Sequence, residues 1–187
     1  MQEFNTDEQA RIVHIKNRIQ DTLHDKLQRM DARLQVLIKF HGVVSGGVSA
    51  SFFHSEQPND IDIYFKHEQA RDEFMNLLKD DKFHTDIADV NPKYGLDTLI
   101  NGKLVTSNAT TFKNGVQIIM MDTISVREHF DYIHTMPWYD CDSKLYHISR
   151  GQYNSIKNKR LVVNPNANPN TPTNSRRMKF LSRGWKE

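Results

Sequence analysis

The chain has 187 residues, of which 37% are apolar, 26% charged and 10% aromatic, and its formal net charge is +2. A chain of this length can bury roughly 70% of the surface of its unfolded state, and its single cysteine, Cys141, excludes a disulfide-stapled scaffold and a cysteine-based zinc site. The sequence has neither an apolar run of membrane-spanning length nor a signal peptide, so we expect a cytoplasmic protein without membrane contact.

Residues 6–40 are predicted to be helical. Thr6 and Gln9 match a capping box, and apolar residues recur every three or four positions, which places them on one stripe. The segment forms either one long helix or two helices joined near Met30 and Asp31. Its stripe either packs on the sheet of the same chain, which we favour, or joins two copies into a homo-oligomer. The stripe consists of Ile12, Ile15, Ile19, Leu23, Leu27, Met30, Leu34 and Leu37.

Residues 41–142 are predicted to form an α+β core, with a mixed or antiparallel sheet backed by helices. A glycine pair separates an apolar strand from a short helix, and two Asn-Gly pairs mark hairpin turns. The expected strands are residues 43–44, 61–65, 98–101, 104–111 and 116–121, and the expected helices are residues 48–54, 68–80 and 125–130. The hairpin turns are expected at residues 101–102 and 114–115.

Residues 143–187 form a basic extension that we expect to pack on this core. They contain ten Lys and Arg and one acid, a net charge of +9, whereas residues 1–142 contain 15 basic and 22 acidic residues, a net charge of −7. Such a segment predicts contact with a polyanion such as RNA, although a solvated surface with clustered charge is the alternative. The last strand expected in the core is at residues 132–138. In the extension we expect strands at residues 145–148 and 161–163, helices at 152–158 and 175–182, and a loop at 164–174.

Asp60 and Asp62 are the strongest candidates for catalytic and metal-binding residues. Residues two apart on a strand project from the same face, so the two carboxylates repel each other unless a cation lies between them. Oxygen ligands of this kind favour Mg²⁺, which proteins often hold with one or two carboxylates and substrate phosphates. A solvent-facing strand that merely carries acids is the alternative.

Gly46 and Gly47 precede this pair, and Ser49 and Ser51 follow them at the start of a helix. Backbone N–H groups at such a turn, together with serine hydroxyls, can hold phosphate oxygens. A phosphate cradle beside a pair of metal-binding acids is what phosphoryl or nucleotidyl transfer requires.

Two segments, Val44-Ser45-Gly46-Gly47 and Asp60-Ile61-Asp62-Ile63-Tyr64-Phe65, resemble the signature of the nucleotidyltransferase superfamily of DNA polymerase beta and the CCA-adding enzymes. Residues 130–132 and 178–185 resemble small nucleotidyltransferase-like proteins of bacteriophage genomes, which implies the cytoplasm of a bacterial host. The resemblance implies an enzyme that uses two Mg²⁺ ions, or Mn²⁺ in their place. The enzyme would transfer a nucleoside monophosphate from a nucleoside triphosphate to a hydroxyl and release pyrophosphate.

The resemblance also implies roles for individual residues. Asp60 and Asp62 would hold the metal ions, and a third acid from a later strand would be Asp122, unless Gln117 takes that place. Residues 130–134 resemble a stretch of the CCA-adding enzymes that lies beside the nucleotide, so His129 and His134 either contact a base or ribose or, as we favour, are structural residues. Gly46, Gly47 and Ser49 would bind the triphosphate. Independently of the resemblance, the positive charges of Lys66, Arg150, Lys157 and Arg160 could reach triphosphate oxygens, and those of Arg176, Arg177 and Arg183 could contact a polynucleotide acceptor.

Two other functions remain open at this point. The chain could be a catalytically inactive nucleotide- or nucleic-acid-binding module of the same fold, or an interaction protein that pairs through residues 6–40. The acceptor of the enzyme could be an RNA 3′ end, a protein or a small molecule.

Overall fold

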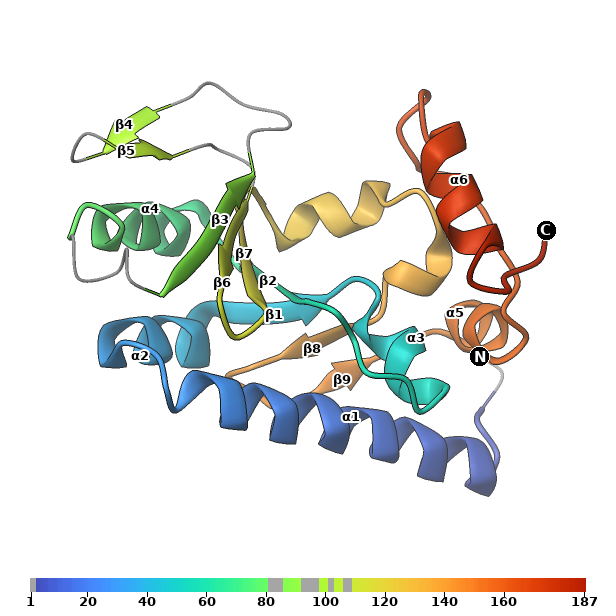
Figure 1. Ribbon diagram of the computed structural model, residues 1–187. Coiled ribbons are helices and arrows are strands. Elements are labelled where there is room, and N and C mark those ends of the chain that lie inside the picture. Colours follow the sequence, from blue (N-terminus) through green and yellow to red (C-terminus); the bar gives the residue numbers. More distant parts are fainter. Residues whose placement is uncertain (1–2, 81–85, 92–97, 101–102, 106–108) are drawn as a thin grey trace.

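The computed structural model describes residues 3–80, 86–91, 98–100, 103–105 and 109–187 (Figure 1). The helices of this part are α1 (Thr6–Leu27), α2 (Ala32–His41), α3 (Val48–Phe53), α4 (Glu68–Leu77), α5 (Arg150–Lys157) and α6 (Asn174–Leu181), with the 3₁₀ helices η2 (Ile124–His129) and η3 (Ile133–Thr135). The strands are β1 (Gly42–Ser45), β2 (Ile61–Phe65), β3 (Ile87–Asn91), β4 (Thr98–Ile100), β5 (Lys103–Val105), β6 (Ala109–Phe112), β7 (Val116–Thr123), β8 (Trp138–Asp140) and β9 (Tyr146–His147).

The centre of the fold is a seven-stranded sheet with the order β3-β6-β7-β2-β1-β8-β9. The pair β2–β7 is parallel and the other neighbouring pairs are antiparallel, so the sheet is mixed, and the predicted α+β class is confirmed. Strands β4 and β5 form a separate two-stranded sheet. Because β2 is the central strand of this order, Asp62 lies in the middle of the sheet.

The N-terminal helical segment is divided into α1 and α2. Asn5 and Glu8 form the capping box of α1, in place of the predicted Thr6 and Gln9, because the Asn5 side chain accepts the Glu8 N–H and Glu8 accepts the Asn5 N–H, each at 3.0 Å. Asp31 caps α2 by accepting the Arg33 N–H at 2.9 Å. The helix therefore breaks at the predicted place.

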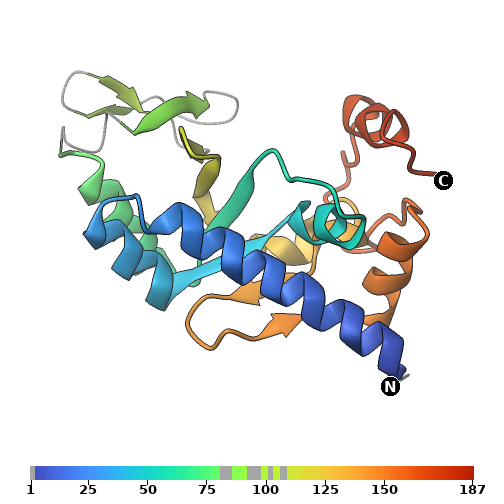
Figure 2. The ribbon, with the colours of Figure 1, turned by 60° about the horizontal axis from the view of Figure 1, so that its bottom comes forward.

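The apolar stripe of α1 packs into the core of the same chain. Ile15, Ile19 and Leu23 are at most 5% exposed and belong to one cluster with residues of the sheet, α2 and α4. Each fully buried side chain of this size contributes roughly 1.5–3 kcal/mol to stability. Both views show α1 running along the length of the molecule, from α2 to α5 (Figures 1 and 2). The favoured packing of the stripe on the chain's own sheet is therefore confirmed.

Several predicted elements differ from the structure. Residues 132–138 form η3 and the start of β8 instead of one strand, because Thr135 donates both its N–H and its hydroxyl back to the Tyr132 carbonyl. Residues 161–163 make only an isolated bridge, between Tyr132 and Val163. Of the predicted strand 104–111, residues 104–105 belong to β5 and residues 109–111 to β6, and residues 106–108 lie outside the described residues. Strand β3 is absent from the prediction.

The two predicted hairpin turns have different outcomes. The Asn114-Gly115 turn joins β6 and β7, and Gly115 has the positive φ of 82° that such a turn requires. Residues 101–102 lie outside the described residues.

The C-terminal segment packs on the core through a second hydrophobic cluster, formed by Ala50, Tyr132, Ile156, Phe180 and Trp185. The hairpin β8–β9 joins residues on both sides of position 142. Both views place α6 at the opposite end of the molecule from α4 (Figures 1 and 2). Within the described ranges, no helix combines the length and apolar character that crossing a membrane requires.

Candidate functional site

The turn after β1 and the middle of β2 are in direct contact. Ser45 at the end of β1 is paired with Asp62 on β2, and the Gly46 N–H donates to the Thr135 carbonyl at 3.0 Å. A Cβ atom at position 46 would lie 2.7 Å from Asp62 Oδ2, and Gly46 has a φ of 99°. Only glycine combines this conformation with so close an approach. Gly46 therefore holds the Asp62 carboxylate against the turn.

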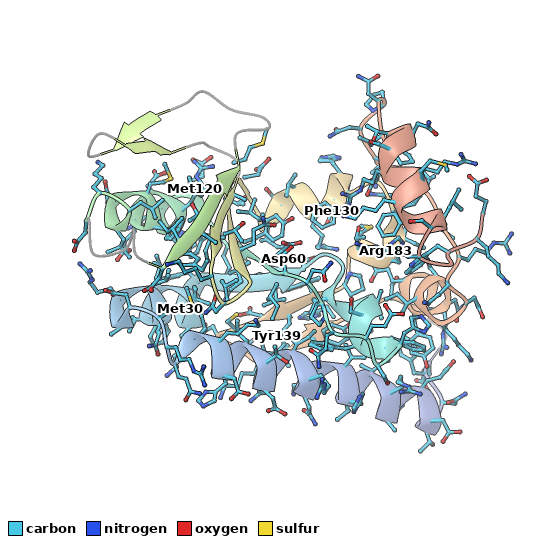
Figure 3. All side chains as sticks on the ribbon, in the orientation of Figure 1. Met30, Asp60, Met120, Phe130, Tyr139 and Arg183 are labelled. Carbon is cyan, nitrogen blue, oxygen red and sulfur yellow. The ribbon has the colours of Figure 1, made fainter. Side chains whose placement is uncertain are left out.

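A cavity of about 310 Å³ opens beside Asp62. Its walls combine acids, cations and aromatic rings from segments far apart in the sequence, and Figure 3 labels Asp60 and Arg183, two of its lining residues. The volume falls at the lower end of the range of small-molecule sites. The lining residues include Gly47, Ser51, His54, Glu56, Asp60, Asp62, Gln117, His134, Lys159, Arg176, Lys179, Phe180, Arg183 and Trp185.

The predicted acidic pair shares this cavity. Asp60 is exposed just before β2, and Asp62 is half-buried within it. Burial and, to a lesser extent, the negative charge of Asp60 raise the pKa of Asp62 to about 6, whereas Arg176 and Lys179 act in the opposite direction. The Asp62 carboxylate is thus within electrostatic reach of both its acidic neighbour and two cations.

Gln117, not Asp122, is the third side chain beside the acidic pair. On the parallel strand β7, Gln117 is in register with Asp62, and it lines the cavity. Asp122 does not line the cavity; its carboxylate accepts the N–H of Thr123, the residue paired with Phe65 at the far end of β2. On β2, Phe65 is three residues from Asp62, and the pairing of β2 with β7 shifts register between Ile63 and Phe65, so Asp122 lies in the irregular part of this pairing. Of the two candidates for the third ligand, Gln117 lines the cavity and Asp122 does not.

Thr111 on β6 orients the amide of Gln117. The Gln117 Nε2 donates to Thr111 Oγ1 at 2.9 Å, so the amide nitrogen is directed to the neighbouring strand. The amide oxygen is not used in this contact and can act as a neutral oxygen ligand.

Ser49 differs from the prediction. It is completely buried, and its hydroxyl lies beside the buried hydroxyl of Tyr146 instead of in the cavity. Residues two apart on a helix point in different directions, and Ser51 lines the cavity instead.

The cations predicted to bind the triphosphate lie elsewhere. Lys66 follows the opposite end of β2 from Asp60 and pairs with Asp140 at 2.8 Å. Arg150 pairs with Glu8 at 2.7 Å and lies over the Phe4 ring, so it joins α5 to the N-terminus. Lys157 and Arg160 are exposed and do not line the cavity.

The cations that do line the cavity come from other positions. Arg176, Lys179 and Arg183 line the cavity from α6 and the turn after it, and Lys159 lines it from the turn after α5. Arg177, predicted as an acceptor contact together with Arg176 and Arg183, pairs with Glu187 instead. Residues 176, 179 and 183 are three and four positions apart, a spacing that places side chains on one face of a helix. This spacing could have predicted that the three cations lie together.

A cluster of aromatic side chains forms the remaining wall of the cavity. The His134 ring is stacked on Trp185 with centroids 3.9 Å apart, and Phe180 meets it edge-on at 4.7 Å. Burial, with a smaller effect from Arg176, lowers the pKa of His134 to about 3, so the ring is neutral. His129, which the sequence analysis considered together with His134, is exposed, and its Nδ1 lies 2.9 Å from the Asn166 carbonyl oxygen.

The donor set at the acidic pair fits Mg²⁺ or Mn²⁺. Two carboxylates and an amide oxygen are hard ligands, and Mg²⁺ commonly completes its shell with water and substrate phosphates. Within the described residues, no group of three or more His, Cys, Asp and Glu side chains could hold a metal ion. The protein itself thus offers two charged ligands and one neutral ligand.

The model of one protein family, the Gabija anti-defense 2 family, matches residues 14–159. Among solved structures, the chain is similar to the CCA-adding enzyme of Thermotoga maritima complexed with tRNA, with a TM-score of 0.44 and 18% identity over 75% of this chain and 35% of that one. It is also similar to an apo CCA-adding enzyme, with a TM-score of 0.42 and 17% identity over 73% of this chain and 34% of that one. A CCA-adding enzyme in complex with CTP has a TM-score of 0.43 and 20% identity over 74% of this chain and 34% of that one. The chain spans about a third of the length of these structures. No curated protein matches it.

Proposed function

Because the chain belongs to the Gabija anti-defense 2 family, we propose that it acts against the Gabija defense system, and that it does so as a Mg²⁺-dependent nucleotidyltransferase. It would transfer a nucleoside monophosphate from a nucleoside triphosphate to a hydroxyl of an RNA 3′ end, a protein or a small molecule. The observation that carries this proposal is that Asp60 and Asp62 share one cavity with several cations. Neutralising charge and positioning the reactants are the main requirements of such a transfer.

In the proposed reaction, the acceptor oxygen forms a bond to the α-phosphorus while the bond from that phosphorus to the bridging oxygen of pyrophosphate breaks. The electron pair leaves with pyrophosphate, and the hydroxyl proton is released to solvent. Asp60 and Asp62, with the amide oxygen of Gln117, would hold Mg²⁺, which when bound neutralises phosphate charge and lowers the pKa of an oxygen nucleophile. Gly46 keeps the Asp62 carboxylate in place.

The test is transfer of label from each of the four α-³²P nucleoside triphosphates, with Mg²⁺, to RNA or protein of cells that carry Gabija. Asp62→Asn should reduce transfer by at least a hundredfold. Asp122→Asn is the matched control, because Asp122 does not line the cavity, and it should retain most of the activity. Equal activity of Asp62→Asn and the unchanged protein would contradict the proposal.

A second function is favoured by one observation, the neutral Gln117 in register with Asp62. With one charged ligand fewer, the site would bind a nucleotide without transferring it, and the protein would act as a nucleotide-binding module. Nucleotide binding in calorimetry, combined with no transfer to any acceptor of these cells, would support the module over the enzyme.

A further inference from the structure

The four cations of the cavity fall into two classes. Arg176 forms an ion pair with the buried Asp131, and Lys159 donates to Glu56 at 3.0 Å, so both have carboxylate partners. Lys179 and Arg183 have no ion-pair partner in the described part of the chain. The cavity therefore holds two cations whose charge no protein group neutralises by direct contact.

These two cations are close to further positive charge. Burial, then the charges of Arg183 and Arg176, lower the pKa of Lys179, whereas Asp62 and Asp60 act in the opposite direction. Lys179 is therefore within electrostatic reach of two other cations and of the acidic pair. Lys179 and Arg183 are four positions apart, about one helical turn, so their side chains can reach neighbouring anionic groups. An anion in direct contact with these cations would offset the repulsion among them.

The shape of the site favours a small anion over a polynucleotide. The cavity is about 310 Å³, which suits a small molecule, whereas a nucleic-acid strand needs a basic groove that continues across the surface. On the same helix, Arg177 is already paired with Glu187, which interrupts such a track. Both side chains also share the cavity with the acidic pair, where a metal ion and several phosphates can meet.

We propose that Lys179 and Arg183 bind the phosphates of a nucleoside triphosphate, and that α6 is therefore part of the substrate site. The inference rests on the proposed function for the identity of the substrate. It also assigns binding residues outside the family match, which ends at residue 159. Arg176 differs from these two cations, because its ion pair with Asp131 holds α6 against the residues before η3.

The experiment measures binding of inorganic tripolyphosphate by calorimetry, without divalent metal, to Lys179→Gln and Arg183→Gln. Each change should weaken binding about tenfold, which corresponds to about 1.4 kcal/mol, and the double change should weaken it further. Lys157→Gln and Arg160→Gln are matched controls, because they remove exposed charges outside the cavity and should bind as the unchanged protein does. Thermal unfolding of every variant verifies that the fold is retained.

The outcomes separate this inference from the proposed function. Tripolyphosphate binding that depends on Lys179 and Arg183, in a protein that transfers no nucleotide, would support the inference and reject the enzyme. Unchanged tripolyphosphate binding by both variants, in a protein that transfers nucleotide, would reject the inference alone. Loss of RNA binding with intact tripolyphosphate binding would also overturn it, and would assign the two cations to the acceptor instead.

Discussion

Gln117 is the residue that most affects what the acidic pair can hold. A carboxylate at this position would add a third negative charge beside Asp62, whereas the amide supplies only an oxygen dipole. The metal affinity of the site should therefore depend on whether residue 117 presents a neutral amide or a carboxylate beside the two acids.

We predict that Gln117→Glu increases the affinity for Mn²⁺ on the order of tenfold, or about 1.4 kcal/mol, because the added charge attracts the cation at short range. Mn²⁺ binding is measured by electron paramagnetic resonance in the absence of nucleotide. Gln117→Leu, which removes the oxygen, should bind Mn²⁺ more weakly than the unchanged protein. Equal affinity in all three proteins would show that position 117 does not contact the ion.

His134 should make the stability of the protein dependent on pH. Its pKa is lowered to about 3 in the folded state, whereas an unfolded histidine has a pKa of about 6.5. Below pH 6.5 the unfolded state thus binds a proton that the folded state does not, so stability is complete above this pH and falls as the pH decreases. The loss is roughly 1.4 kcal/mol per pH unit.

We predict that His134→Phe removes this contribution, so that its free energy of unfolding falls less steeply between pH 6 and pH 5. Urea unfolding at several pH values gives the two slopes. His24→Gln is the control, because His24 is exposed on α1 and its loss should leave the slope unchanged. The same slope in His134→Phe and in the unchanged protein would show that His134 is protonated in the folded state.

At the scale of elements, α1 contributes to the core of its own chain. We predict that Ile19→Ala lowers the free energy of unfolding by about 2–5 kcal/mol, because Ile19 is 1% exposed and the deletion leaves a cavity. Val13→Ala on the same helix should change it by less than about 0.5 kcal/mol, because Val13 is 52% exposed. Chemical denaturation measures both. A change of similar size at the two positions would contradict this packing.

Elements with strong local signals could be predicted from the sequence. The periodic stripe of α1 and α2, the alternating strand β2 and the Asn114-Gly115 turn each depend on neighbours in the chain. The predicted strand 132–138 is wrong because Thr135 forms a turn with Tyr132 and its carbonyl accepts the N–H of Gly46, the residue after β1. Such contacts with distant residues leave no periodicity in the sequence.

The candidate site could be predicted only where its residues are close in sequence. The acidic pair and Gly46 form one local motif, and the structure places the carboxylate of Asp62 against that glycine. The choice between Gln117 and Asp122 depended on the register of β7 against β2, which the sequence does not determine. The cations depended on where α6 lies, and α6 follows the core by more than thirty residues.

At the scale of the whole molecule, two hydrophobic clusters divide the fold between them. The larger one joins α1, α2, α4 and the sheet, and the smaller one attaches α6 to α3 and α5 through Phe180 and Trp185. Elements held by separate clusters can open separately, with different free energies. The acids of the site belong to the part built on the larger cluster, and Lys179 and Arg183 to the part held by the smaller one.

We therefore predict that Trp185→Ala releases α6 without unfolding the sheet. Trp185 is 7% exposed and stacks on His134, so its loss should cost about 3–5 kcal/mol within the smaller cluster. Hydrogen exchange measured by mass spectrometry should show faster exchange in residues 174–187 and unchanged exchange in β1, β2 and β7. Met178→Ala is the control, because Met178 is on the same helix but 52% exposed. Faster exchange throughout the sheet of Trp185→Ala would mean that both clusters unfold as one unit, and that α6 cannot leave the acidic pair while the core stays folded.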